Sequence, residues 1–118
     1  MKKFLLPLAV SFFSLLSFTA HAELNVLACE PEWAALTIEL GGDKVKVSSA
    51  TTALQDPHRI EARPSLIAKA RNADLLICTG LELEVGWLPV LLQQSGNKKV
   101  APGEMGNFIA GSKKKKLD

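Results

Sequence analysis

The sequence lacks the short motifs that mark the common classes of enzyme. Its 118 residues contain no glycine-rich phosphate-binding loop, no nucleophile elbow and no His-Glu-x-x-His helix. Cysteine is scarce: the chain has two, and their spacing fits neither a zinc finger nor a Cys-x-x-Cys redox pair. We therefore expect a protein that is not an enzyme.

A large net charge is also lacking. Lys2 and Lys3 account for the whole formal net charge of +2, so the chain that follows the first 22 residues is neutral. Its residues 113–116 are all lysine, and without this block the same part of the chain is acidic. Nucleic-acid binding needs a basic surface, so we do not expect nucleic acid as a partner.

Residues 1–22 have the pattern of a secretory signal peptide. Two lysines precede an apolar run at residues 4–18, and Ala20-His21-Ala22 predicts cleavage after Ala22. The apolar run is shorter than the roughly 20 residues of a membrane-spanning helix, which favours removal over a permanent anchor. We expect an exported, periplasmic protein with no stable membrane insertion after cleavage.

Strand and helix patterns alternate after the leader. Short apolar or alternating runs predict strands, and apolar residues at helical spacing predict helices. The expected elements are a strand at 24–29, a helix at 31–40, a strand at 44–48, a helix at 63–71, a strand at 74–78, a helix at 85–94 and a short strand at 98–101. This alternation is typical of an α/β fold, here a small open parallel sheet with helices on both faces.

The pattern ends at Pro102. Glycines and lysines interrupt the rest of the chain, as in segments that stay disordered. The expected organisation is a signal peptide at 1–22, one α/β lobe at 23–101 and a disordered or truncated tail at 102–118.

Polar residues follow each clear strand, and a parallel sheet collects its binding residues at that edge. Glu30 follows the first strand, the loop after the second contains His58, and Glu82 and Glu84 follow the third. An imidazole together with carboxylates suits a divalent transition metal. The alternative is that His58 is an ordinary turn residue and that Glu82 and Glu84 form a solvated helix start.

Cys29 and Cys78 each occupy the last apolar position of an expected strand. If these strands are neighbours, their ends lie within the short Cα separation that a disulfide requires. An oxidising compartment favours the bond, and two buried free thiols are the alternative.

Four features together resemble the periplasmic zinc/manganese-binding proteins of metal ABC transporters, the TroA-like solute-binding family. They are a leader that runs directly into the first strand, Asp56-Pro57-His58, Asn72-Ala73-Asp74-Leu75, and Thr79-Gly80-Leu81-Glu82-Leu83-Glu84 followed by Gly86-Trp87-Leu88. The resemblance covers residues 24–100.

The resemblance implies two similar α/β lobes joined by a long helix, with the metal between them, and this chain as the amino-terminal lobe. It implies His58 as the first ligand and places Glu82 where a histidine is common, with Glu84 as the fallback. The implied cargo is a divalent metal ion, zinc in preference to manganese. The implied partner is an inner-membrane ABC permease, which receives the metal from this periplasmic substrate-binding component.

The linking helix and the second lobe of that family have no counterpart in the 118 residues. We therefore expect a truncated or frameshifted member of the family, or a fragment. Two alternatives stay open: an exported redox or hydrolytic domain that uses Cys29, Cys78 or the loop with Ser48, Ser49 and His58, and a remnant that binds no ligand.

Overall fold

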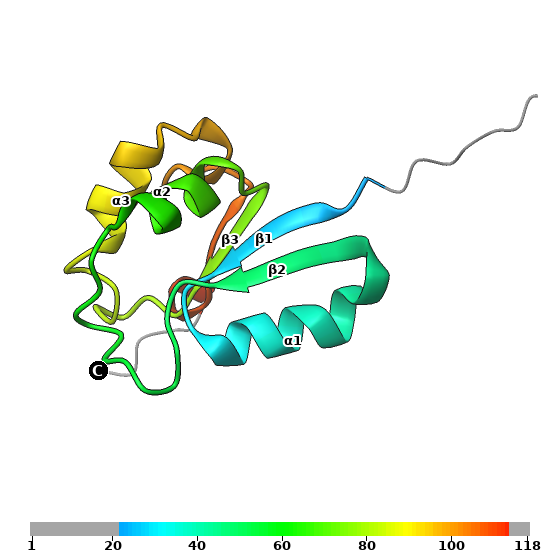
Figure 1. The fold of residues 1–118 in the computed structure, drawn as a ribbon, viewed down its shortest axis with the longest axis horizontal. Helices are drawn as coiled ribbons and strands as arrows, with labels where there is room; N and C mark the ends of the chain where they lie inside the picture. The colour runs from blue at the N-terminus through cyan, green and yellow to red at the C-terminus, as the bar shows by residue number, and fades with distance from the viewer. Residues whose placement is uncertain (1–21, 114–118) are drawn as a thin grey trace, which may run out of the picture.

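The computed structural model describes residues 22–113, so the leader up to His21 and residues 114–118 lie outside it. The described chain forms one sheet of four parallel strands in the order β2-β1-β3-β4 (Figure 1). The strands are β1 (Leu24–Ala28), β2 (Val45–Ser49), β3 (Leu75–Cys78) and β4 (Asn107–Ile109). The prediction of a small parallel α/β sheet is confirmed, with β2 at one edge.

Three α-helices cover the sheet: α1 (Pro31–Gly41), α2 (Pro64–Arg71) and α3 (Leu88–Ser95). Each has a proline in its first turn, where a helix has no use for the missing N–H. Helix α1 packs against β1 and β2 on one face, while α2 and α3 lie together on the other (Figure 1). Helix α3 begins three residues later than expected, because residues 85–87 form a turn. None of these helices is both long and apolar enough to cross a membrane.

The main core lies between the sheet and the pair α2–α3. It includes Leu27, Cys29, Leu66, Ala70, Leu76, Cys78, Trp87, Leu91 and Val100. Helix α1 contributes no fully buried residue, and Leu40 near its end is 79% exposed. The two faces of the sheet are therefore buried to different extents.

The last part of the described chain differs from the expectation. Residues 98–101 do not form a strand, because Asn97 accepts a hydrogen bond of 3.0 Å from the backbone N–H of Lys99 and begins the 3-10 helix Lys98–Val100. The fourth strand is β4, which pairs with β3 inside the segment expected to be disordered. The expectation of disorder is thus wrong for residues 107–113, where β4 and a short 3-10 helix form.

Candidate metal site

The carboxyl ends of β1 and β3 are joined by the disulfide Cys29–Cys78, with a Cα–Cα distance of 4.8 Å. The predicted bond is confirmed, because β1 and β3 are adjacent and in parallel register. Both cysteines of the chain are used, so no free thiol is available for a redox role. The disulfide fixes the edge of the sheet from which the polar loops extend.

His58 lies on the loop between β2 and α2 and is held by its neighbour Asp56. The Oδ1 atom of Asp56 accepts hydrogen bonds from the backbone N–H of His58 (3.0 Å) and from its ring Nδ1 (2.8 Å). These two bonds, the backbone one first, hold the pKa of Asp56 below its usual value. A proton on Nδ1 leaves the lone pair of Nε2 for a metal. The His58 side chain is 63% exposed, so a ligand can reach it from solvent.

The His58 loop is also fixed to the start of α3. The indole Nε1 of Trp87 donates a hydrogen bond of 2.7 Å to the backbone carbonyl of Pro57, and Trp87 is buried. Gly86 lies against the same loop, since a Cβ built there would be 3.1 Å from the carbonyl oxygen of His58. Residues that are about 30 positions apart thus hold the imidazole at the edge of the sheet.

The Glu84 carboxylate is buried and hydrogen-bonded to the backbone, so it is not a free ligand. Its side chain is buried, and its two oxygens accept hydrogen bonds from the backbone N–H groups of Thr79 (2.8 Å) and Gly80 (2.9 Å). Gly80 has a φ of 77°, and the two following residues, Leu81 and Glu82, also have positive φ. Glu84 therefore stabilises a tight left-handed turn after β3.

Glu82 is exposed on that turn. The structure does not bring its carboxylate, His58 and Glu84 into one compact cluster. Within residues 22–113, the one group of three potential ligand atoms within 4.8 Å of one another is Cys29, Cys78 and Glu84. Its two sulfurs are bonded to each other, so this group is not a metal site while the disulfide is intact.

Glu30 is the least satisfied carboxyl group among the described residues. It follows β1, its side chain is 2% exposed, and neither Oε1 nor Oε2 has a hydrogen-bond partner there. Burial, followed by the adjacent Glu84 carboxylate, raises the pKa of Glu30 to about 9. An acidic side chain buried in this way is a typical feature of binding sites.

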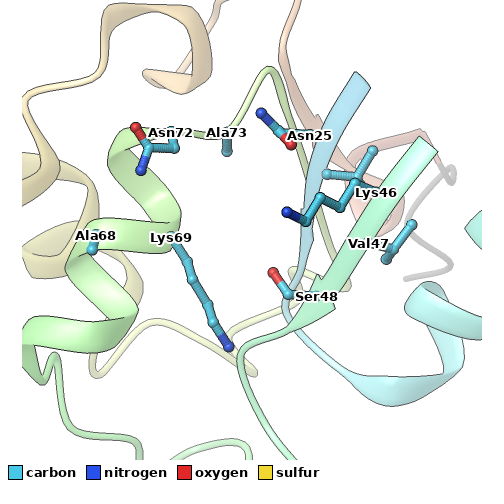
Figure 2. A pocket seen from close by; sticks show the side chains of 9 residues that line it. Asn25, Lys46, Val47, Ser48, Ala68, Lys69, Asn72 and Ala73 are labelled. Carbon is cyan, nitrogen blue, oxygen red and sulfur yellow. The ribbon is translucent and has the colours of Figure 1, made fainter. Parts of the chain in front are cut away.

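Two cavities lie near the sheet, and they differ in chemistry. One of about 300 Å³ is lined by Glu30 and by the loop that leads to Pro57. The other, of about 450 Å³, lies between β2 and α2, where Figure 2 shows Lys46 and Lys69 extending into the same space. Two ammonium groups repel a metal cation, so the cavity between β2 and α2 does not suit a metal.

Asp56 and Trp87 are residues of this region whose roles the sequence analysis did not predict, whereas Glu30 was expected at this edge of the sheet. Asp56 could have been found from the Asp-Pro-His order, because a carboxylate two residues before a histidine can reach its ring. No local signal relates Trp87 to Pro57, because the contact depends on how α3 folds back onto the loop.

A parallel sheet with its polar residues at the carboxyl edge is the architecture of one lobe of a metal-binding solute-binding protein. A family model described as ZnuA, zinc-uptake complex component A, periplasmic, matches residues 26–116. The chain belongs to this family.

Curated relatives agree with this assignment. The chain is 33% identical over 84 residues to the metal ABC transporter substrate-binding lipoprotein ScbA of Streptococcus cristatus. It is 32% identical to the manganese ABC transporter substrate-binding lipoprotein scaA of Streptococcus gordonii. Each match covers 69% of this chain and 27% of the relative, so the chain spans about a quarter of the length of these proteins. A third relative, 32% identical, is the iron ABC transporter substrate-binding lipoprotein MtsA of Streptococcus pyogenes, covering 65% of this chain and 26% of the relative.

Solved structures show the same lobe. The Mn-bound periplasmic metal binding protein of Candidatus Liberibacter asiaticus matches with a TM-score of 0.55 and 28% identity, covering 58% of this chain and 26% of that one. Zn(II)-bound AdcA of Streptococcus pneumoniae matches with a TM-score of 0.54 and 27% identity, covering 65% and 16%. These similarities confirm the resemblance expected from the sequence motifs.

Proposed function

We propose that this chain is a substrate-binding component, or part of one, of a metal ABC importer. In this proposal, His58 is the first ligand of a divalent metal ion. The observation that carries the proposal is the Asp56–His58 pair, because the carboxylate orients the ring and leaves Nε2 for the metal. The proposed location is the periplasm, after export and removal of the leader, and the proposed partner is the membrane permease that receives the metal.

Glu82 is the proposed second donor, since it is exposed on the turn that follows the carboxyl end of β3. Glu84 is a weaker candidate, because both of its oxygens already accept backbone hydrogen bonds. Two donors leave the remaining coordination positions to water, so we expect weaker binding than in a closed site.

The proposed metal is zinc or manganese. The relatives are named for manganese and iron, and the two solved structures hold manganese and zinc. The zinc preference expected from the sequence has no support in these comparisons, and a Glu82 ligand would favour the harder manganese ion.

Calorimetric titration of the chelator-treated protein with Zn²⁺ and Mn²⁺ tests the proposal. His58→Ala should weaken binding of the preferred metal by at least tenfold. Arg59→Ala is the matched control, because it removes an exposed cation from the same loop without removing a donor. Equal binding by wild type and His58→Ala would refute His58 as a ligand.

A further inference from the structure

Two residues on the turn after β3 have an unusual backbone conformation. Leu81 and Glu82 have φ angles of 54° and 71°, and among residues 22–113 no other non-glycine residue has a positive φ. Gly80, directly before them, has a φ of 77°. A residue with a side chain adopts this conformation at a cost, and the strain persists only where surrounding structure imposes it. The neighbours of the turn therefore determine the backbone conformation of Glu82, the proposed second donor.

Strand β4 is one of these neighbours. Its Ile109 is in register with Cys78, the last residue of β3, so the end of β4 lies beside the start of the turn. A Cβ at position 80 would overlap with the side chain of Ile109. Glycine at this position therefore allows both the positive φ and the close approach of β4.

Gly111, which is buried just after β4, makes the closest contacts with the turn. Its backbone N–H donates a hydrogen bond of 2.7 Å to the carbonyl of Thr79. A Cβ built on Gly111 would be 2.7 Å from that carbonyl oxygen and 2.5 Å from Cγ of Leu81. Both separations are too short for real atoms, so any other residue at position 111 would displace the turn.

We propose that Gly111 is a positioning residue for the second metal donor. By fixing Thr79 and Leu81, it holds the backbone of Glu82 in the observed conformation before a metal binds. Glu84 fixes the same turn from within, through the N–H groups of Thr79 and Gly80. A donor on a loosely held loop loses conformational freedom on binding, which weakens the complex. This inference rests on the proposed function, because Gly111 acts through Glu82 as a ligand.

The test is a double-mutant cycle between Gly111→Ala and Glu82→Gln. Wild type, the two single variants and the double variant are purified after expression of the full chain, treated with chelator and titrated calorimetrically with Zn²⁺ and Mn²⁺. Gly41→Ala is the matched control, because a Cβ there would also be crowded, 2.6 Å from Cγ1 of Val45, but at the end of α1. Urea unfolding shows whether each variant is folded.

We expect Gly111→Ala to weaken binding of the preferred metal by about tenfold. In the Glu82→Gln background the same substitution should cost no further affinity, because the donor that it positions is already absent. Gly41→Ala should bind as wild type does, even if it unfolds more easily. Wild-type affinity in Gly111→Ala would overturn the inference. An equal loss of affinity in both backgrounds would also overturn it, because a merely structural role predicts that result.

Leu81→Gly tests the same inference without adding an atom to the buried contact. Leu81 is 65% exposed, and glycine adopts its positive φ without strain, so this variant should fold whether or not Gly111→Ala does. Loss of the side chain that contacts Gly111 should free the turn and weaken metal binding, again only when Glu82 is present. Wild-type affinity in Leu81→Gly would contradict the positioning role.

The outcomes for His58→Ala separate this inference from the proposed function. Equal metal binding by wild type and His58→Ala would refute the proposed function itself. Weakened binding in His58→Ala together with wild-type affinity in Gly111→Ala would leave the proposed function intact and remove only the role of Gly111.

Discussion

The indole Nε1 of Trp87 donates a hydrogen bond of 2.7 Å to the backbone carbonyl of Pro57. This bond connects the start of α3 to the residue before His58, across a separation of 30 positions. Glu84 stabilises the turn that precedes Trp87, because its carboxylate oxygens accept hydrogen bonds from the backbone N–H groups of Thr79 and Gly80. The geometry of the His58 loop therefore depends on hydrogen bonds that Trp87 and Glu84 make with the backbone.

Replacing Trp87 with phenylalanine should loosen the His58 loop while keeping most of the packing. The partly buried Pro57 carbonyl loses its donor, so the free energy of unfolding should fall by about 1–2 kcal/mol. Metal affinity should fall as well, because His58 is less well placed. Urea unfolding and metal titration measure the two effects. Trp33→Phe is the control: it removes a 2.8 Å bond to Thr79 Oγ1, away from this loop. If the two variants lose equal affinity, the loop has no special role.

Asp56→Asn should weaken metal binding without unfolding the protein. The amide cannot accept from the His58 ring as strongly as the carboxylate, so the Nδ1-protonated form is less favoured. Loss of such a partner typically costs 10–100-fold in metal affinity. Asp56 is exposed, and thermal unfolding should change little. Asp43→Asn, at another exposed aspartate, is the control, and unchanged affinity in Asp56→Asn would contradict the orienting role.

Glu84→Gln and Glu82→Gln should have opposite consequences. A glutamine at position 84 can accept through one oxygen only, so one backbone N–H of the turn loses its partner, and stability should fall by about 2 kcal/mol. Glu82 is exposed, and its replacement should leave stability unchanged while it weakens metal binding. Urea unfolding and metal titration of both variants separate the roles. A stable Glu84→Gln variant that has lost its metal would make Glu84 a ligand instead.

The stability of the protein should depend on pH through Glu30. Its pKa is raised to about 9 in the folded state from an ordinary value of 4.5, so the folded chain holds one more proton between these values. The contribution of this group to stability is complete below about pH 4.5 and is lost as pH rises towards 9. The slope is at most about 1.4 kcal/mol per pH unit.

Glu30→Gln removes this titration. The variant should therefore be more stable than wild type at pH 8, and the difference should shrink towards pH 4. Urea unfolding of metal-free protein across this range measures it. If the free energies of unfolding of the two proteins depended on pH in the same way, the pKa of Glu30 would not be raised in the folded state.

Most of the fold could be predicted from local patterns. The apolar runs at β1 and β3 and the helical spacing of apolar residues are local features, and they predict the alternating order and the parallel sheet. Strand β4 could not be predicted, because Asn107–Ile109 is short and surrounded by glycines, and its pairing with β3 is a tertiary contact. Residues 98–101 were predicted to form a strand, but capping by Asn97 gives the 3-10 helix Lys98–Val100.

The candidate site could be predicted only in part. The positions of the two cysteines at strand ends predicted the Cys29–Cys78 bond, which the structure contains. The Asp-Pro-His order predicts His58 as a metal ligand, and that stays a prediction. The role of Glu84 depends on the positive φ angles at Leu81 and Glu82, which are unusual for residues with side chains and cannot be read from residue type. Glu30 is buried, and its carboxyl oxygens have no hydrogen-bond partner among the described residues. No local sequence pattern predicts this, because the burial depends on residues distant in the sequence.

The most direct test of the account is whether the His58 ring binds the metal. The chain has two histidines, so a nitrogen–proton correlation spectrum of the rings, compared with that of His58→Ala, identifies His58 without ambiguity. On addition of Zn²⁺, we predict that the Nε2 resonance of His58 shifts while Nδ1 stays protonated and bonded to Asp56. An unchanged His58 spectrum at saturating metal would contradict the proposed function.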